Sequence, residues 1–173
     1  LVGTTLEVLT ERTREEWRLK RWRSALREHT VVVGFGTKGR SAVQTVCATG
    51  LKKEQVVVVD PSAKVIDAAT ADGYAGVMGD ATRSDVLRRA EVHKARQIIV
   101  APQRDETAVL VTLTARQLNS SATIVAAVHE EENDPLLRQS GDDTVINIAR
   151  AAGPLLGLSV LSPAARRVLE HIL

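Results

Sequence analysis

Residues 30–39 read TVVVGFGTKG, a valine run that leads directly into a G-x-G-x-x-G sequence. A glycine pattern placed between a strand and a helix is typical of a dinucleotide- or mononucleotide-binding turn. Gly34 permits the tight turn, Gly36 lets the backbone approach a pyrophosphate, and Gly39 allows the helix to pack close to the strand. The start of the helix would then offer free N–H groups to phosphates. The alternative is a fold of the same kind whose site has lost its ligand.

Short apolar runs recur after this stretch, and most of them lack polar alternation, as expected for strands buried on both faces of a parallel sheet. Segments with apolar residues at helical spacing lie between them, so we predict an α/β fold, a Rossmann-like doubly wound parallel sheet. The expected strands are Thr30–Gly34, Gln55–Asp60, Tyr74–Met78, Gln97–Ala101, Ala122–Val128 and Thr144–Ile148. The expected helices are Gly39–Thr49, Ser62–Ala71, Ser84–Ala90, Asp105–Leu118 and Asp134–Gln139.

Candidate ligand-binding residues follow the predicted strands. Asp60 closes the second strand, where it can accept hydrogen bonds from ribose hydroxyls, and its charge disfavours the 2′-phosphate of NADP. We expect Asp60 to lie outside the core; an additional role as helix N-cap is compatible with this position. Asp80 is equally compatible with a ligand contact and with an N-cap. The full set is Gly34, Phe35, Gly36, Thr37, Lys38, Gly39, Asp60, Pro61, Asp80, Ala81, Thr82, Ala101 and Gln103.

The composition of the 173 residues excludes several classes of protein. The net charge of +2 and the four aromatic residues, of which only Phe35 and Tyr74 lie beyond the first 29 residues, argue against a nucleic-acid partner. The single cysteine, Cys47, excludes a disulfide framework and a cysteine-based zinc site. Apolar runs stay shorter than the roughly 18 residues that span a bilayer.

Catalysis would require a reactive side chain beside the ligand. Of the four histidines, His29, His93 and His171 are expected away from the carboxyl ends of the strands, and only His129 follows a strand closely enough to reach them. No catalytic constellation can be assembled from these positions, so we predict a binding protein and not an enzyme.

Six segments, in this order, resemble the RCK domain, the regulator of potassium conductance with a Trk-type nucleotide-binding fold. They are HTVVVGFGTKGRSAV (29–43), VVVVDPS (56–62), GVMGDATRSDVLRRA (76–90), ARQIIVA (95–101), ETAVLVTLTARQLN (106–119) and HEEENDPLLRQSGDDTVI (129–146). The resemblance covers about residues 29–173. Asp142 is one departure, because alanine is usual at that position of the family's pattern.

The resemblance implies a non-enzymatic sensor on the cytoplasmic side of the cell membrane. In the family such domains form a homo-oligomeric ring of paired domains below a potassium channel pore, or accompany a transporter, and they bind NAD, ATP, ADP or Ca²⁺. Asp143 lies where some channel RCK domains contribute a calcium ligand, with partner carboxylates past Leu173. The residues themselves favour a simpler role for the acidic cluster 130–134, as the charged first turn of a helix.

The resemblance and the residue pattern together divide the chain into three parts. Residues 1–29 form a basic amphipathic linker helix, 30–148 the Rossmann-like lobe, and 149–173 a crossover helix-turn-helix for dimerisation. The linker could pack on its own domain, lie on an anionic membrane, or continue an inner pore helix; its apolar start and non-Met first residue favour the pore helix. We therefore expect a channel domain; the alternative is a soluble regulatory subunit of a Trk- or Ktr-type potassium transporter. The helix-turn-helix is expected as a helix through Leu156, a turn at Leu161–Pro163 and a helix from Ala164.

Overall fold

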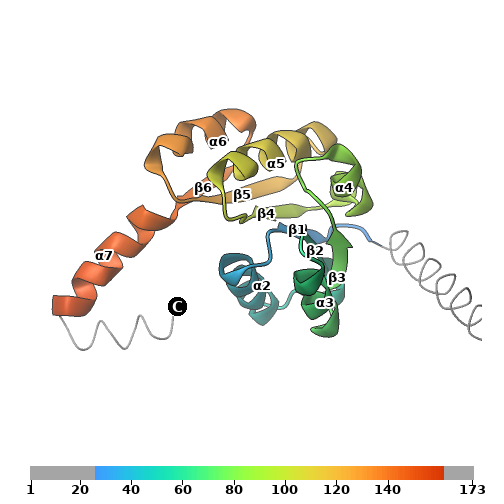
Figure 1. Cartoon of the computed structure of the whole chain (residues 1–173), viewed down its shortest axis with the longest axis horizontal. Helices are drawn as coiled ribbons and strands as arrows, with labels where there is room; N and C mark the ends of the chain where they lie inside the picture. The colour runs from blue at the N-terminus through green and yellow to red at the C-terminus, as the bar shows by residue number, and fades with distance from the viewer. Residues whose placement is uncertain (1–25, 162–173) are drawn as a thin grey trace, which may run out of the picture.

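Strands and helices alternate in the computed structural model, which describes residues 26–161 (Figure 1). The strands are β1 Thr30–Val33, β2 Val56–Asp60, β3 Ala75–Met78, β4 Gln97–Val100, β5 Thr123–Val128 and β6 Thr144–Asn147. The helices are α2 Thr37–Ala48, α3 Ala63–Ala71, α4 Ser84–Arg89, α5 Asp105–Leu118, α6 Asp134–Ser140 and α7 Ile148–Leu161. Short 3-10 turns occupy Lys53–Gln55, Val92–Lys94 and Glu131–Asn133. The expected α/β alternation is confirmed, with the ends of most elements displaced by one or two residues.

All strand pairs in the described part of the chain are parallel, and the strand order is β3-β2-β1-β4-β5-β6. The chain first builds outward from β1 to β3 and then returns to place β4 on the other side of β1. The strand order therefore reverses between β1 and β4, which is the point at which open α/β sheets bind ligands. We call the side where the strands end the carboxyl edge, and the side where they begin the amino edge.

The valine runs place apolar side chains on both faces of the sheet. Val32, Val56 and Val58 face α2 and α3 and pack with Phe35 and Tyr74. Val31, Val33, Val57 and Val59 face the other layer, where Leu87 of α4 and Val111 of α5 are fully buried. Figure 1 shows the two layers, with α2 and α3 on one side and α4, α5 and α6 on the other. Burial of each valine side chain stabilises the folded state by roughly 1.5–3 kcal/mol. Because successive valines point to opposite faces of the sheet, the valine runs form a core on both faces.

The tail differs from the sequence expectation. α7 continues to Leu161, five residues beyond the predicted end at Leu156, with Pro154 inside the helix. It follows β6 and leads away from the sheet (Figure 1). The predicted turn at 161–163 and the second helix from Ala164 lie almost entirely outside the described residues. No helix within residues 26–161 is long and apolar enough to cross a membrane.

The end of the predicted linker belongs to the sheet domain. Residues 26–29 are not helical, and Leu26 is 5% exposed within the larger core cluster. The N–H of Glu28 donates to the carbonyl of Lys94 at 3.1 Å, and His29 Nε2 lies 3.0 Å from the carbonyl of Ala90. The expectation of a linker helix through residue 29 is therefore wrong for these four residues, because Leu26 and His29 are held at the amino edge. Residues 1–25 lie outside the described range.

Candidate functional site

The glycine-rich loop Gly34–Gly39 connects β1 to α2 at the carboxyl edge. Gly34 has a φ of 82°, and a Cβ on it would lie 2.6 Å from the carbonyl oxygen of Ala101. A Cβ on Gly39 would lie 2.0 Å from the carbonyl oxygen of Gly34. Both contacts are too short for any side chain. These two glycines therefore hold the start of α2 against β1 and against the segment after β4.

Gly36 has the opposite surroundings. A Cβ on this residue would meet no protein atom within 4 Å. Gly36 is the N-cap of α2, and its carbonyl accepts the N–H of Arg40 at 3.0 Å. The N–H groups that precede Arg40 in the first turn have no acceptor within the helix, and the helix dipole makes this end positive. The open space beside Gly36 therefore fits the approach of a phosphate group to the backbone.

Phe35 contributes to this loop through its backbone and not through its ring. The side chain is 1% exposed and packs edge-on against Tyr74, with ring centroids 5.7 Å apart. The Arg40 guanidinium covers the ring, with its central carbon 5.1 Å from the ring centroid. The ring is thus part of the core below the loop, whereas Thr37 is exposed beside Gly36.

Asp60 lies beside the loop, as predicted, but its carboxylate is tied to the backbone on both sides. Oδ2 accepts the N–H of Phe35 at 3.0 Å, and Oδ1 accepts the N–H of Ser62 at 2.9 Å. Asp60 is only 9% exposed, so the expectation that it lies outside the core is wrong. The N-cap of α3 is Ser62, so the expected additional role of Asp60 as a helix N-cap is wrong as well. Pro61, between Asp60 and Ser62, is exposed. Each oxygen keeps a second lone pair with which to accept a ribose hydroxyl.

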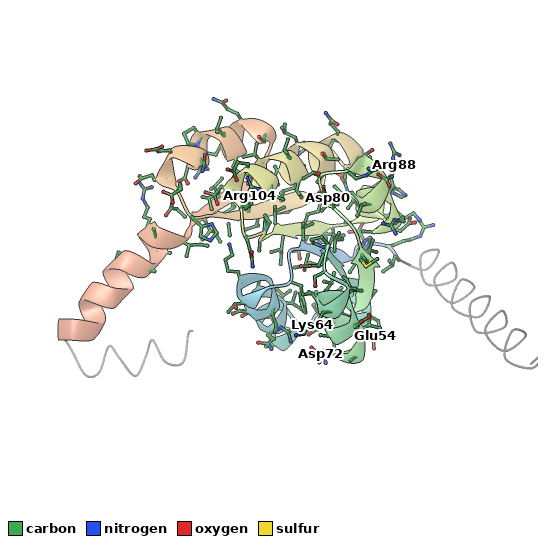
Figure 2. All side chains as sticks on the ribbon, viewed as in Figure 1. Glu54, Lys64, Asp72, Asp80, Arg88 and Arg104 are labelled. Carbon is green, nitrogen blue, oxygen red and sulfur yellow. The ribbon has the colours of Figure 1, made fainter. Side chains whose placement is uncertain are left out.

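The segment after β3 lies next to Asp60, because the N–H of Gly79 donates to the Asp60 carbonyl at 3.0 Å. Asp80 is exposed near the end of β3 (Figure 2). Its Oδ1 accepts the backbone N–H and the hydroxyl of Thr82 at 2.9 and 2.7 Å, and these hydrogen bonds lower the pKa of Asp80. The N-cap of α4 is Arg83, so Asp80 does not have the capping role that the sequence left open. Ala81 between them is buried.

The segment after β4 completes the candidate set. The N–H of Ala101 donates to the carbonyl of Val33 at 2.8 Å and extends the pairing of β1 with β4. Ala101 is buried, whereas Gln103 is exposed. Because the strands are parallel, the four segments that follow β1 to β4 meet at the carboxyl edge, and all candidate residues except the calcium candidate lie there. Their contact with a ligand stays a prediction.

Lys38 extends the site toward β5. Its ammonium group lies 2.9 Å from the carbonyl oxygen of Pro102 and 3.1 Å from Nε2 of His129. His129 is therefore at the carboxyl edge, where sequence analysis allowed it. On its other side, Nδ1 of His129 lies 2.9 Å from Oδ1 of Asp105. A chain of polar contacts thus runs from α2 through His129 to the first residue of α5.

Asp105 is the most strongly bound carboxylate of this edge. It is 7% exposed and accepts the backbone N–H groups of His129 and Glu130 at 3.0–3.1 Å. The side-chain amide of Asn133 also donates to it, at 3.0 Å. Burial by itself raises the pKa of Asp105, but the hydrogen bonds from Glu130, His129 and Asn133 outweigh burial and lower it to about 2. The charged carboxylate of Asp105 therefore holds the segment between β5 and α6 in place.

Sequence analysis missed Asp105, which appeared only as the first residue of a predicted helix. The residues that donate hydrogen bonds to Asp105 lie 24–28 positions further along the chain. The signal was present in an acidic first residue after a buried strand, but the same pattern describes an ordinary helix start.

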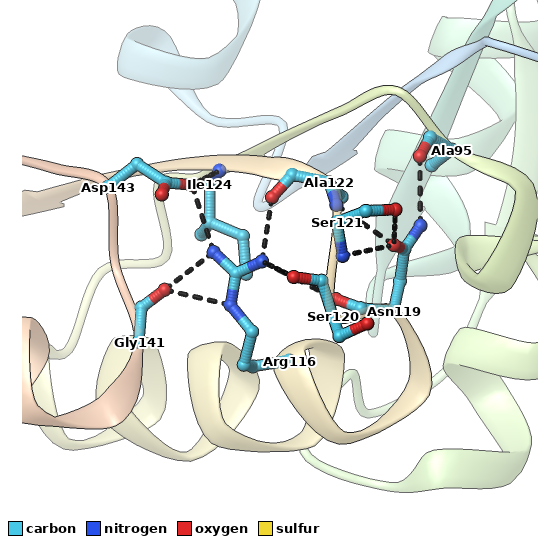
Figure 3. A network of polar contacts seen from close by, with 9 residues as sticks. All are labelled: Ala95, Arg116, Asn119, Ser120, Ser121, Ala122, Ile124, Gly141 and Asp143. Atoms are coloured by element: carbon cyan, nitrogen blue, oxygen red, sulfur yellow. Dashed lines mark hydrogen bonds and ion pairs between the residues drawn. The ribbon is translucent and has the colours of Figure 1, made fainter.

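Asp143, the calcium candidate, lies at the amino edge, before β6, and so away from the loop. Its Oδ2 accepts the N–H of Ile124 at 2.7 Å and pairs with the Arg116 guanidinium at 2.9 Å. Arg116 also donates to the carbonyl groups of Ala122 and Gly141, so it joins α5, β5 and the end of α6 (Figure 3). Within residues 26–161, no group of three or more His, Cys, Asp or Glu side chains could hold a metal ion. Calcium binding by Asp143 stays a prediction.

Comparison with known proteins agrees with the fold. The TrkA-N domain model matches residues 30–148. Probable potassium channel protein 2 of Methanocaldococcus jannaschii is 27% identical over 151 residues, which cover 85% of this chain and 44% of that protein. The chain spans less than half the length of the curated relatives that share most of it, from 24% to 44%.

Solved structures place the same fold in related proteins. The GsuK channel bound to NAD superposes with a TM-score of 0.68 at 27% identity, covering 77% of this chain and 24% of that one. The TrkA-N domain of the Escherichia coli inner membrane protein ybaL has a TM-score of 0.72 at 21% identity, covering 80% of this chain and 99% of that one. The latter likeness shows the fold alone. The GsuK RCK domain also superposes with a TM-score of 0.68 at 27% identity, which confirms the resemblance to RCK domains. Because the family model covers more than half of this chain, the chain belongs to the TrkA-N domain family.

Proposed function

We propose that this chain is the nucleotide-sensing RCK domain of a potassium channel. The domain would lie on the cytoplasmic side of the membrane, and ligand binding to it would regulate the channel pore. The main support for this proposal is the family match over residues 30–148, together with a relative named as a potassium channel protein. A ligand changes gating only through its different affinities for two states of the domain. The site accordingly has to bind a ligand and need not transform it.

The proposed ligand is an adenine nucleotide, NAD or ADP or ATP. GsuK, which shares 27% of its aligned residues with this chain, has been solved bound to NAD. In this chain, Gly36 leaves open space for the phosphates and Asp60 keeps lone pairs for a ribose. Asp60 would repel a 2′-phosphate, so NADP is not an expected ligand.

We also propose that the chain does not act as an enzyme. Among the histidines within residues 26–161, only His129 lies at the carboxyl edge, and both of its ring nitrogens have polar partners in Lys38 and Asp105. The geometry at this edge suits binding and positioning. A reaction would need a general acid or base directed at the ligand.

The ligand proposal is tested by thermal unfolding of the 173-residue chain with NAD⁺, ADP, ATP and NADP⁺. A ligand at 100 times its Kd adds about 2.7 kcal/mol of stability, so the melting temperature should rise with the first three and not with NADP⁺. Equal rises with NAD⁺ and NADP⁺ would refute the selectivity assigned to Asp60. If no nucleotide raises the melting temperature, the sensor proposal fails.

A pair of glycine variants supplies the site control. Gly36→Ala places a methyl group in open space, so it should lose only the small stability that alanine costs at a helix N-cap and should lose the rise with NAD⁺. Gly39→Ala meets the Gly34 carbonyl and should lower the melting temperature without any ligand. A Gly36→Ala variant that still responds fully to NAD⁺ would move the ligand away from the loop.

The proposed assembly is a homo-oligomer of paired domains attached to a pore. Light scattering should show at least a dimer at tens of micromolar protein, and a monomer would contradict the pairing. The attachment is tested by the coding sequence ahead of residue 1: a pore helix and a potassium-selectivity loop support the channel. Their absence would favour the transporter-subunit alternative.

Calcium is proposed as a second ligand through Asp143. Since Oδ2 of Asp143 is already engaged by Arg116 and Ile124, this residue can provide only part of the six to eight oxygen ligands that calcium requires. Isothermal titration with CaCl₂, with Asp143→Asn as the comparison, tests the proposal. Binding that is identical in the two chains would exclude Asp143 as a ligand.

A further inference from the structure

Residues 26–29, which precede β1, are fastened at the amino edge to the turn between α4 and β4. The N–H of Glu28 donates to the carbonyl of Lys94 at 3.1 Å, and the carbonyl of His29 accepts the N–H of Arg96 at 2.9 Å. These contacts join the preceding part of the chain to the sheet domain. We call residues 26–29 the clasp.

The ring of His29 lies at the centre of the clasp. It is 0% exposed, and its Nε2 lies 3.0 Å from the carbonyl oxygen of Ala90, just after α4. A carbonyl group can only accept, so Nε2 carries the proton of the neutral ring and donates it. Nδ1 is buried as well and has no hydrogen-bond partner among the residues that the structure describes. A second proton, on Nδ1, would therefore form a buried N–H group without an acceptor.

The surroundings of the ring favour its neutral form. Burial lowers the pKa of His29 below the ordinary 6.5, and Lys94 and His93 add to this effect through their charge. The hydrogen bond to Ala90 and the negative charge of Glu91 act in the opposite direction. Because burial outweighs these two contributions, the closed clasp holds the ring without its second proton.

The backbone on each side of this contact is strained. Glu28 and Glu91 have φ values of 56° and 55°, and within residues 26–161 they are the two residues other than glycine with positive φ. Glu28 precedes His29, and Glu91 follows Ala90, whose carbonyl accepts from the ring. A left-handed conformation is unfavourable for a residue with a side chain and persists only where the surrounding contacts impose it. Opening the contact lets the backbone at Glu28 relax.

We infer that the clasp is released by acid: a neutral His29 ring pins residues 26–29 to the turn after α4, and protonation of Nδ1 frees them. The inference goes beyond the proposed function, because the clasp needs neither a nucleotide nor a pore. Closing the clasp lowers the pKa of His29, so closure is fully stabilised above about pH 6.5 and weakens as the pH falls below that value.

Release changes the connection between the sheet domain and the chain that precedes it. Leu26, which is 5% exposed in the larger core cluster, leaves the core when the clasp opens. The four freed residues, when extended, add up to about 13–14 Å to the reach of the preceding chain. In a channel of the kind proposed above, acid would therefore slacken the tether through which the domain acts on the pore.

Hydrogen exchange of the 173-residue chain, followed by NMR at pH 7.5 and 5.5 and corrected for intrinsic exchange rates, tests the clasp. The Glu28 amide reports closure, because it donates to Lys94. An open-state histidine with a pKa of about 6.5 raises the open fraction by up to about tenfold between these two pH values. The protection of Glu28 should fall accordingly, and unchanged protection would overturn the inference.

A reference amide separates local opening from unfolding of the domain. The N–H of Gly34 donates to the carbonyl of Val59 at 3.0 Å, at the opposite edge of the sheet. Its protection should be the same at both pH values. A loss of protection at Gly34 that parallels the loss at Glu28 would show unfolding of the whole domain and would overturn a local clasp.

Two histidine variants identify the group that responds. His29→Gln keeps an amide N–H that can donate to Ala90 but cannot take up a proton, so the protection of Glu28 should not change with pH. His93→Gln removes an exposed histidine of the same turn and is the matched control, which should lose protection as the parent does. The inference fails if His29→Gln loses protection on acidification or if His93→Gln no longer does.

The parent chain supplies a measurement that does not depend on the folding of the variants. In an NMR titration of the histidine-labelled chain, the midpoint of His29 should lie below pH 6.5. The loss of Glu28 protection should follow the same curve. A His29 midpoint at or above 6.5 would overturn the inference. A chain that binds no nucleotide but opens in acid would refute the proposed ligand and support the clasp.

Discussion

Asp105 at the carboxyl edge and Asp142 at the amino edge are both withdrawn from water, yet their surroundings differ. Asp105 accepts hydrogen bonds from His129, Glu130 and Asn133, and its pKa is about 2. Both carboxylate oxygens of Asp142 are inaccessible and have no hydrogen-bond partner within the described residues. Burial and the nearby charge of Asp143 raise the pKa of Asp142 to about 7, although Arg116 and Arg138 oppose the rise.

The comparison teaches that burial alone does not decide the charge of a carboxylate. Burial raises the pKa at both positions, and the directed N–H donors at the carboxyl edge reverse its effect. Those donors are backbone and side-chain groups of the segment between β5 and α6, so the charge of Asp105 and the position of that segment depend on each other. At the amino edge, the Arg116 guanidinium donates to Asp143 and to neighbouring carbonyl groups, and no donor in the described part of the chain reaches the Asp142 carboxylate.

The largest expected effect is that of Asp105→Ala. It leaves the N–H groups of His129 and Glu130 and the amide of Asn133 without their acceptor, so the free energy of unfolding should fall by about 3 kcal/mol or more. Chemical denaturation measures the loss. Asp85→Ala is the control, because Asp85 is also in the first turn of a helix but is exposed; this variant should unfold as the parent does. Similar losses in the two variants would show that Asp105 has no special structural role.

Acid unfolding checks the same carboxylate. The pKa of Asp105 falls from 3.8 to about 2 on folding, so its contribution is fully present above pH 4 and is lost as the pH falls toward 2. At about 1.4 kcal/mol per unit, the contribution is about 2.5 kcal/mol. The stability of the parent chain should therefore drop between pH 4 and 2 more steeply than that of Asp105→Ala. Parallel curves would contradict the assigned pKa.

Arg116→Met should have the next largest effect. The arginine donates to the carbonyl groups of Ser120, Ala122 and Gly141 at 2.7–3.0 Å, and methionine keeps an apolar stem but no donor. We expect the free energy of unfolding to fall by about 2 kcal/mol in thermal or urea unfolding. Arg104→Met, which removes an exposed arginine ahead of the same helix, is the control (Figure 2). No difference between the two variants would contradict the structural role of Arg116.

Local sequence patterns predicted the sheet and the loop because both depend on neighbouring residues. The valine runs and the glycine spacing identified the strands, the helices and the carboxyl-edge segments, and α5 has the expected bounds. The contact between Lys38 and His129 could not be predicted in this way, because it joins residues 91 positions apart. The burial of Asp60 was missed for a related reason: its partner Phe35 is 25 positions away. The end of α7 was predicted at Leu156, whereas the helix continues to Leu161; the apolar residues after Leu156 gave no local stop signal before Pro163.

Asp142→Ala should stabilise the chain, whereas Asp105→Ala should destabilise it. Alanine is usual at this position of the RCK pattern, and the Asp142 carboxylate has no hydrogen-bond partner among residues 26–161. Because folding raises its pKa from 3.8 to about 7, the parent loses stability as the pH rises from 4 to 7. We expect a gain of about 1–2 kcal/mol for the variant at pH 8 and a smaller gain at pH 5. A gain that does not depend on pH would show that the carboxylate titrates normally.

Asp143→Asn should have the smallest effect, although the residue lies next to Asp142. The side chain of Asp143 is half exposed, and an asparagine oxygen can still accept from Ile124 and Arg116. The charge pair with Arg116 is therefore expected to contribute less than about 1 kcal/mol, and salt should screen it. The variant has a second consequence, because removing the charge of Asp143 takes away one cause of the raised pKa of Asp142. The loss of stability of Asp143→Asn should accordingly shrink between pH 5 and pH 8 as Asp142 ionises. Denaturation at the two pH values measures this coupling, and a loss that grows with pH would show that Arg116, and not Asp142, is the main partner of that charge.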